Sequence, residues 1–107
     1  MAWIYLTIAG VFEIGWPVGF KLSQTTGHRI GWIAFAVISM AFSGMFLWLA
    51  QKIIPIGTAY AIWTGIGATG TLIIGILAFH DPAGLLRMLF LLMIIIGMIG
   101  LRFTSPS

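Results

Sequence analysis

The chain has 107 residues, of which 61% are hydrophobic and only 7% charged, and its mean hydropathy is +1.14. This composition excludes a soluble globular domain, whose surface needs many more charged groups. The formal charge of +3 comes from basic residues scattered singly between apolar runs, which argues against a nucleic-acid-binding patch. The absence of cysteine excludes disulfides and thiolate metal sites, and no cofactor is expected.

Four apolar segments account for nearly the whole chain, because a membrane-crossing helix needs roughly 20 apolar residues. The first is expected over about 2–20 and is interpreted as a retained span, since no Lys or Arg precedes it and Glu13 lies within it. Polar residues predict a loop over 23–29. The other spans are expected over about 30–50, 55–79 and 84–103. The predicted fold class is therefore an all-α membrane protein with a single four-helix transmembrane domain.

The basic residues divide almost evenly between the two sides of the membrane. With four spans, three basic residues fall on one side and two on the other: Lys21, Arg29 and Arg87 against Lys52 and Arg102. Orientation follows the Lys and Arg asymmetry of short loops. So small a bias predicts insertion in both orientations and allows an antiparallel homodimer, which would supply the inverted repeats that many transporters carry within one chain.

Glycine is abundant and predicts close contacts between helices. Two such pairs are Gly15 with Gly19 in the first span and Gly97 with Gly100 in the fourth, and the sequence alone does not decide between packing within the chain and a dimer contact. Gly65, Gly67 and Gly70 satisfy G-x-G-x-x-G, but they lie in a long apolar run with no preceding strand. We therefore expect a bend or close packing here and no nucleotide site.

Glu13 is the foremost candidate for function. A charged side chain near the centre of a membrane helix costs about 2.5 to 3.5 kcal/mol on the insertion scale, and no basic residue in the spans is placed to pair with it. Helical spacing puts Gly10 and Trp16 on its face. Pro17 lacks the N–H that would bond the Glu13 carbonyl, so a kink is expected there. The alternatives are an acid near the interface, or one satisfied by Ser, Thr or Trp.

Aromatic residues in the third span predict a cation site. Tyr60 and Trp63 share one helix face, and with Trp16 they are suited to an aromatic box around a cation. Ordinary aromatic packing is the alternative. Ser39 and Ser43 share a face of the second span. A serine in a membrane helix most often bonds the backbone of its own helix. Ser43 is nevertheless a candidate for the site.

These features resemble the small multidrug resistance family of bacterial exporters along the whole chain. The most specific match is the run PIGTAYAIWTGIG, residues 55–67, which enters the third span. Gly10, Glu13, Trp16 and Lys21 resemble the guanidinium-exporter branch more than the polyaromatic-drug branch. The resemblance implies a multi-pass protein of the bacterial inner membrane, a dual-topology dimer, and exchange of guanidinium for protons.

The resemblance also implies a set of substrate- and proton-binding residues. They are Gly10, Glu13, Trp16, Ser43, Tyr60 and Trp63. Pro17 departs from the family, in which a small residue such as Ala is usual, and His80-Asp81 replaces a more common Lys-Glu type pair. These departures leave the range of substituted guanidinium compounds open.

The resulting hypothesis is a proton-coupled antiporter with two Glu13 side chains facing each other in the dimer, where guanidinium and protons compete for the same oxygens. Ser43 would orient Glu13, Trp16 and Trp63 would enclose the cation, and Tyr60 would link the site to a moving helix. One alternative is a polyspecific quaternary-ammonium exporter, and another is a non-transporting membrane partner subunit. An enzyme is not expected, because the sequence offers Glu13 no second catalytic group.

Overall fold

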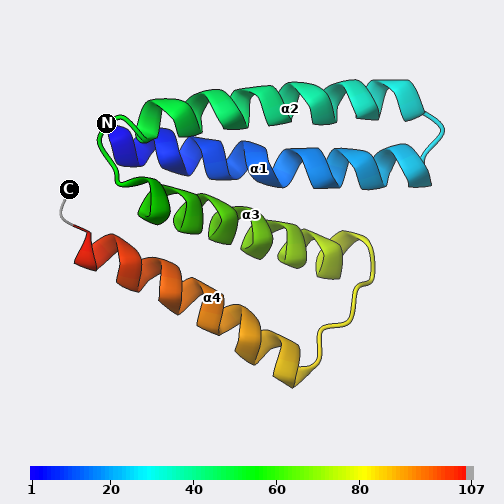
Figure 1. The fold of residues 1–107 in the computed structure, drawn as a ribbon. Helices are drawn as coiled ribbons and strands as arrows, with labels where there is room; N and C mark the ends of the chain where they lie inside the picture. The colour runs from blue at the N-terminus through cyan, green and yellow to red at the C-terminus, as the bar shows by residue number, and fades with distance from the viewer. Residues whose placement is uncertain (106–107) are drawn as a thin grey trace.

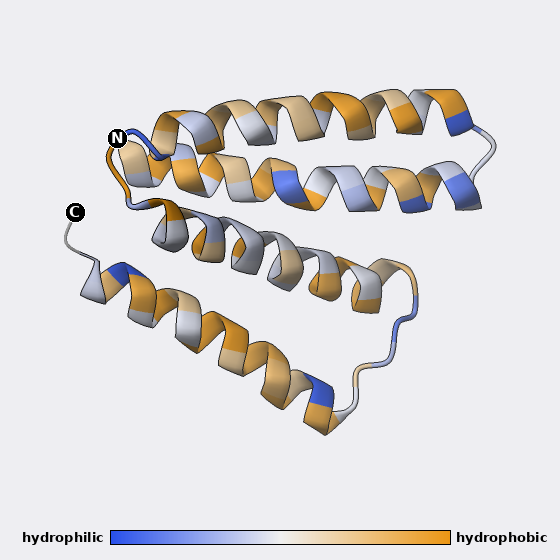
Figure 2. Ribbon diagram, viewed as in Figure 1, coloured by the Kyte–Doolittle hydropathy of each residue, from blue (hydrophilic) through white to orange (hydrophobic). Residues whose placement is uncertain are grey.

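The computed structural model describes residues 1–105, and these form four helices joined by short connections (Figure 1). In chain order they are α1 (Ala2–Thr25), α2 (Arg29–Ala50), α3 (Ile56–Ala78) and α4 (Leu85–Thr104). Each helix has at least 20 residues and is apolar enough to cross a membrane. Figure 2 shows hydrophobic residues along α2 and α4 and residues of intermediate hydropathy over much of α3, whereas hydrophilic residues lie mainly at helix ends and connections and at the middle of α1. The predicted all-helical class with four candidate spans is confirmed.

The first helix is longer than the sequence predicted. It continues to Thr25, so the prediction that residues 23–25 belong to a loop was wrong. The reason is local, because the hydroxyl of Ser23 donates to the Phe20 carbonyl at 2.6 Å and that of Thr25 donates to the Lys21 carbonyl at 3.1 Å. Polar side chains satisfied in this way are compatible with a helix end.

The helices lie side by side in the order α2, α1, α3, α4 (Figure 1). The molecule is flattened, with principal extents of 46 × 34 × 16 Å. The α4 helix contacts α3 alone, so within the described residues the helices form a thin layer and not a closed bundle. The α1–α2 and α3–α4 connections lie at one end, and the α2–α3 connection lies at the other, with the start of α1 and the end of α4 (Figure 1).

Glycines on α1 and α3 allow the helices to approach closely. A Cβ added at Gly15 would lie 2.8 Å from the Ser39 hydroxyl of α2, and one at Gly19 would lie 2.9 Å from the ring of Phe35. The Gly15 and Gly19 pair thus packs within the chain. Gly97 and Gly100 of α4 differ, because no atom of the described chain lies within 4 Å of a Cβ built on either residue.

The fourth helix is the least covered element. Its backbone approaches α3 alone within the described residues, and Met98 fills the space that a side chain at Gly65 would occupy. Leu91 is the one residue of this helix that is buried. The apolar side chains on the rest of α4 therefore face either lipid or a second protein chain.

Candidate functional site: an acid between two tryptophans

Glu13 lies at the middle of α1 and is held by a residue of its own helix. Trp16, three residues further along, donates its indole N–H to Glu13 Oε1 at 2.7 Å. Residues at this spacing lie on the same helix face, so the pairing follows directly from the sequence. Of the alternatives considered for this acid, a carboxylate with a tryptophan partner is the one that the structure contains.

Ser43 connects the three helices around Glu13. Its hydroxyl oxygen accepts the indole N–H of Trp63 at 2.8 Å, and it lies 2.8 Å from the Ala9 carbonyl and 3.5 Å from Glu13 Oε1. A serine hydroxyl has one proton to donate. The shorter distance favours Ala9 as its acceptor, so Ser43 bonds a carbonyl of α1 and not one of its own helix.

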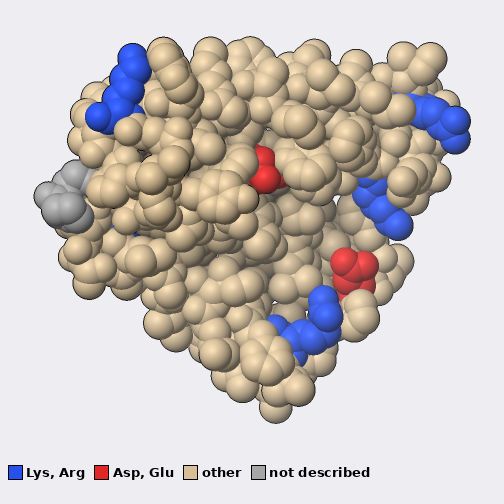
Figure 3. All heavy atoms as spheres, in the orientation of Figure 1, with Lys and Arg blue, Asp and Glu red and all other residues tan. Residues whose placement is uncertain are grey.

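A cavity of about 230 Å³ opens beside this network. It is lined by Glu13, Trp16, Met40, Gly44 and Trp63, so α1, α2 and α3 all contribute. Glu13 Oε2 accepts no hydrogen bond from the described residues. Figure 3 shows acidic atoms at two places on the viewed face, one in a hollow near its middle and one beside the α3–α4 connection. An acid between two indole rings is chemically suited to a small cation.

The space for the Glu13 side chain comes from a residue that the sequence analysis did not assign to the site. A Cβ added at Gly67 would lie 2.5 Å from Glu13 Cγ, so the absence of a side chain there lets the acid pack against α3. Both residues are at the middle of their helices, which is the signal that could have paired them. Gly10 instead makes room for Ile66, whose Cγ2 would lie 2.6 Å from an added Cβ.

The structure brings two of the three predicted aromatic residues to the cavity. Trp16 and Trp63 line it, whereas Tyr60 lies outside this lining with 56% of its surface exposed. The Tyr60 ring remains 5.4 Å from that of Trp63, centroid to centroid. Tyr60 therefore extends the aromatic surface outward from the cavity, and a box of three rings is not complete within one chain.

Pro17 lies inside α1, and the helix continues through it. Its ring lines a different cavity of about 240 Å³, together with Lys21 and Asp81.

Asp81 helps to end α3. Its backbone N–H donates to the Gly75 carbonyl at 3.0 Å, and the residue before it, His80, has a φ of 60°. Within the described residues, no group of three or more His, Asp or Glu side chains is placed to hold a metal ion.

Comparisons with known proteins agree with this architecture. Residues 1–94 match the family model described as Small Multidrug Resistance protein. The chain is 46% identical to the guanidinium exporter of Yersinia pseudotuberculosis and 47% identical to that of Proteus vulgaris, over 98% of this chain and all of each relative. It is 41% identical to the guanidinium exporter of Escherichia coli K12 over 98% of this chain and 99% of that protein. The chain is therefore a four-span membrane transporter, not an enzyme, and it belongs to the small multidrug resistance family of bacteria.

Proposed function

We propose that this protein exports guanidinium, or a small substituted guanidinium, in exchange for protons. The observation that carries the proposal is the Glu13 carboxylate, which has one oxygen bonded to Trp16 and the other without a hydrogen-bond partner in the described chain. The three relatives compared above are each named as guanidinium exporters, which supports the same substrate.

Guanidinium suits this site by charge, shape and size. It is planar and donates paired N–H groups to a carboxylate, which strengthens the contact relative to a neutral hydrogen bond. The indole rings of Trp16 and Trp63 are available for cation–π contacts of about 0.5 to 2 kcal/mol each. The cavity of about 230 Å³ that one chain contributes has room for a small cation.

Competition at Glu13 couples the two fluxes. A proton and a guanidinium ion both require the lone pairs of this carboxylate, so binding of one displaces the other. If either ligand permits the change between inward-open and outward-open states, each substrate leaving the cell is exchanged for protons entering it. The ligand acts by binding the two states with different affinity.

The working unit is an antiparallel dimer of this chain. The Glu13 cavity is lined by α1, α2 and α3 and is not covered by α4, so a second copy placed over it would close the site. The exposed Tyr60 and the uncovered α4, where Gly97 and Gly100 have no neighbour in the described chain, offer surfaces for that copy. Such a dimer would bring two Glu13 carboxylates to one site.

Exchange measured in liposomes tests the proposal. An outward guanidinium gradient should drive proton uptake with the natural chain, whereas Glu13→Gln should abolish it because the amide cannot exchange a proton. The matched control is Asp81→Asn, which removes the other acidic residue of the chain and leaves Glu13 in place. We expect this control to retain exchange.

Three outcomes would contradict the proposal. Normal exchange by Glu13→Gln would remove the acid from the mechanism. Transport of a bulky quaternary ammonium ion without transport of guanidinium would identify a polyspecific drug exporter. No substrate-driven proton flux from correctly folded protein would favour a partner subunit that does not transport by itself.

A further inference from the structure

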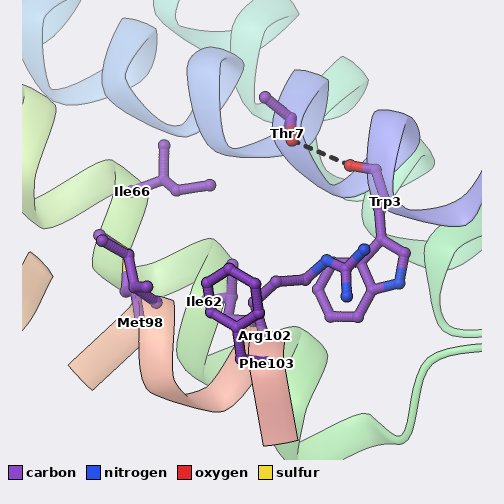
Figure 4. Close-up of a pocket in the computed structure, with 8 residues that line it drawn as sticks. Trp3, Thr7, Ile62, Ile66, Met98, Arg102 and Phe103 are labelled. Carbon is purple, nitrogen blue, oxygen red and sulfur yellow. Dashed lines mark hydrogen bonds between the residues drawn. The ribbon is translucent and has the colours of Figure 1, made fainter. Parts of the chain in front are cut away.

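A second cavity, of about 290 Å³, lies between α1, α3 and α4 and shares no lining residue with the Glu13 cavity. Most of its wall is apolar, with Ile62 and Ile66 contributed by α3 and Met98 and Phe103 by α4 (Figure 4). One cationic side chain, Arg102, lines its end. The mechanism proposed for Glu13 uses none of these residues.

Arg102 is positioned by an aromatic ring. Its guanidinium carbon lies 4.2 Å from the centroid of the Trp3 ring, which holds the cation beside the cavity (Figure 4). Stacking on a ring occupies the face of a guanidinium group, and the N–H groups point outward in its plane. No acceptor in the described residues takes a hydrogen bond from these N–H groups. The N–H groups of Arg102 are therefore suited to an anionic ligand at this end of the cavity.

The depth of the cavity in the membrane defines the ligand chemistry. Arg102 is in the last turn of α4, a helix long enough to cross a membrane, so its charge is expected at the level of lipid headgroups. From this end, the lining residues extend along α4 from Arg102 to Met98 and along α3 from Ile62 to Ile66. Four residues of helix correspond to about one turn, so the cavity reaches roughly 6 Å toward the membrane centre. A positive group at the surface followed by an apolar cleft matches an amphiphile with an anionic head.

We infer that this cavity binds an anionic phospholipid, with its phosphate on Arg102 and a segment of one acyl chain between α1, α3 and α4. Arg binds phosphate through paired N–H groups, and basic pockets between membrane helices accept anionic headgroups. A guanidinium substrate is disfavoured at this cavity, because Arg102 repels it. The inference is independent of the export mechanism, since it requires neither Glu13 nor the dimer.

Lipid retention measured by native mass spectrometry tests the inference. The natural chain, loaded with an equal mixture of phosphatidylglycerol and phosphatidylcholine, should retain phosphatidylglycerol preferentially. Arg102→Gln should lower that retention by about fivefold, the effect of one basic group near an anionic membrane surface. The control is Arg87→Gln, which removes an exposed Arg at the opposite end of α4, where its Nε donates to the Pro82 carbonyl. We expect this variant to retain the lipid as the natural chain does.

A second variant tests the apolar part of the site. Ile99 lines the cavity, and Ile99→Trp should fill part of it and lower retention with Arg102 intact. Circular dichroism and the thermal midpoint in detergent establish that each variant is folded. Equal retention of phosphatidylglycerol by the natural chain and by folded Arg102→Gln would overturn the inference and leave Arg102 as a solvated end charge. Equal losses with Arg87→Gln would overturn it as well, because they would indicate a diffuse charge effect.

Discussion

The Ser43 hydroxyl has two acceptors within reach and one proton to share between them. It lies 2.8 Å from the Ala9 carbonyl and 3.5 Å from Glu13 Oε1, while its own oxygen accepts from Trp63. In the proposed mechanism, a Glu13 carboxylate that has released its cation or proton is the stronger acceptor and would draw the hydroxyl from Ala9. Ser43 would then connect Glu13 with Trp63, which donates to the same oxygen.

Replacement of Ser43 tests this role at the level of one residue. In Ser43→Ala, the Trp63 indole N–H loses its acceptor, and holding the ring at the cavity without that bond costs about 1 to 3 kcal/mol. We expect guanidinium binding, measured by calorimetry on the purified protein, to weaken by roughly tenfold, since about 1.4 kcal/mol corresponds to that factor.

The matched control for this change is Ser39→Ala. Ser39 is also buried on α2, one turn before Ser43, but it packs beside Gly15 and lines no part of the Glu13 cavity. Its replacement should leave the affinity within about twofold. Similar affinities for the Ser43 and Ser39 variants would show that the hydroxyl network has no part in binding.

At the scale of the helices, the sequence predicted the number of spans and the neighbours of Glu13 on its own helix face. Runs of about 20 apolar residues specified four spans, and the spacing of Glu13 and Trp16 placed a donor beside the acid. The end of α1 was misplaced, because hydroxyl groups at Ser23 and Thr25 satisfy themselves on the helix backbone. The polar composition of this segment had indicated a loop.

What the sequence did not reveal is which helix each glycine faces. Gly10 and Gly67 both lie on the contact between α1 and α3, but only Gly67 contacts the acid. Tyr60 and Trp63 share a helix face in the sequence, yet only Trp63 turns into the cavity. Both assignments depend on how three helices rotate against one another, and helical spacing within a single segment holds no information on that rotation.

Close approach of α1 and α3 makes Gly67 a sensitive position. In Gly67→Ala, the new methyl group would meet Glu13 Cγ at 2.5 Å and force the carboxylate away from its present position. We expect guanidinium-driven proton uptake in liposomes to fall by tenfold or more, because small displacements of a reacting group strongly reduce its efficiency.

Gly57→Ala is the control, since the same change in the same helix meets no atom of the described chain within 4 Å. It should transport at close to the natural rate and unfold at a similar or slightly higher temperature, because Ala favours a helix more than Gly does. Full activity of Gly67→Ala would mean that Glu13 does not need its present contact with α3.

At the scale of the whole molecule, the thin layer and the charge distribution point to the same assembly. One chain leaves its acid on an open face, and its basic residues are divided three to two between the two ends. Lys52 lies 4.4 Å over the Trp48 ring and Arg102 lies 4.2 Å over the Trp3 ring, so both cations at one end rest on aromatic residues. With so small a difference in charge, neither orientation in the membrane is strongly preferred.

Shifting the charge balance should therefore separate the two orientations. The first set of substitutions, Gln24→Lys with Gly27→Arg, adds two positive charges at the α1–α2 end. The second set moves the excess of positive charge to the opposite end, and it combines Arg29→Ser with Gln51→Lys and Ile53→Arg. Because Lys and Arg near short loops are retained in the cytoplasm, each set should fix one orientation, as read from reporters fused to the C-terminus. Cells with either set alone should lose resistance to guanidinium, and cells with both sets should recover it. Full resistance from either set alone would contradict the antiparallel dimer.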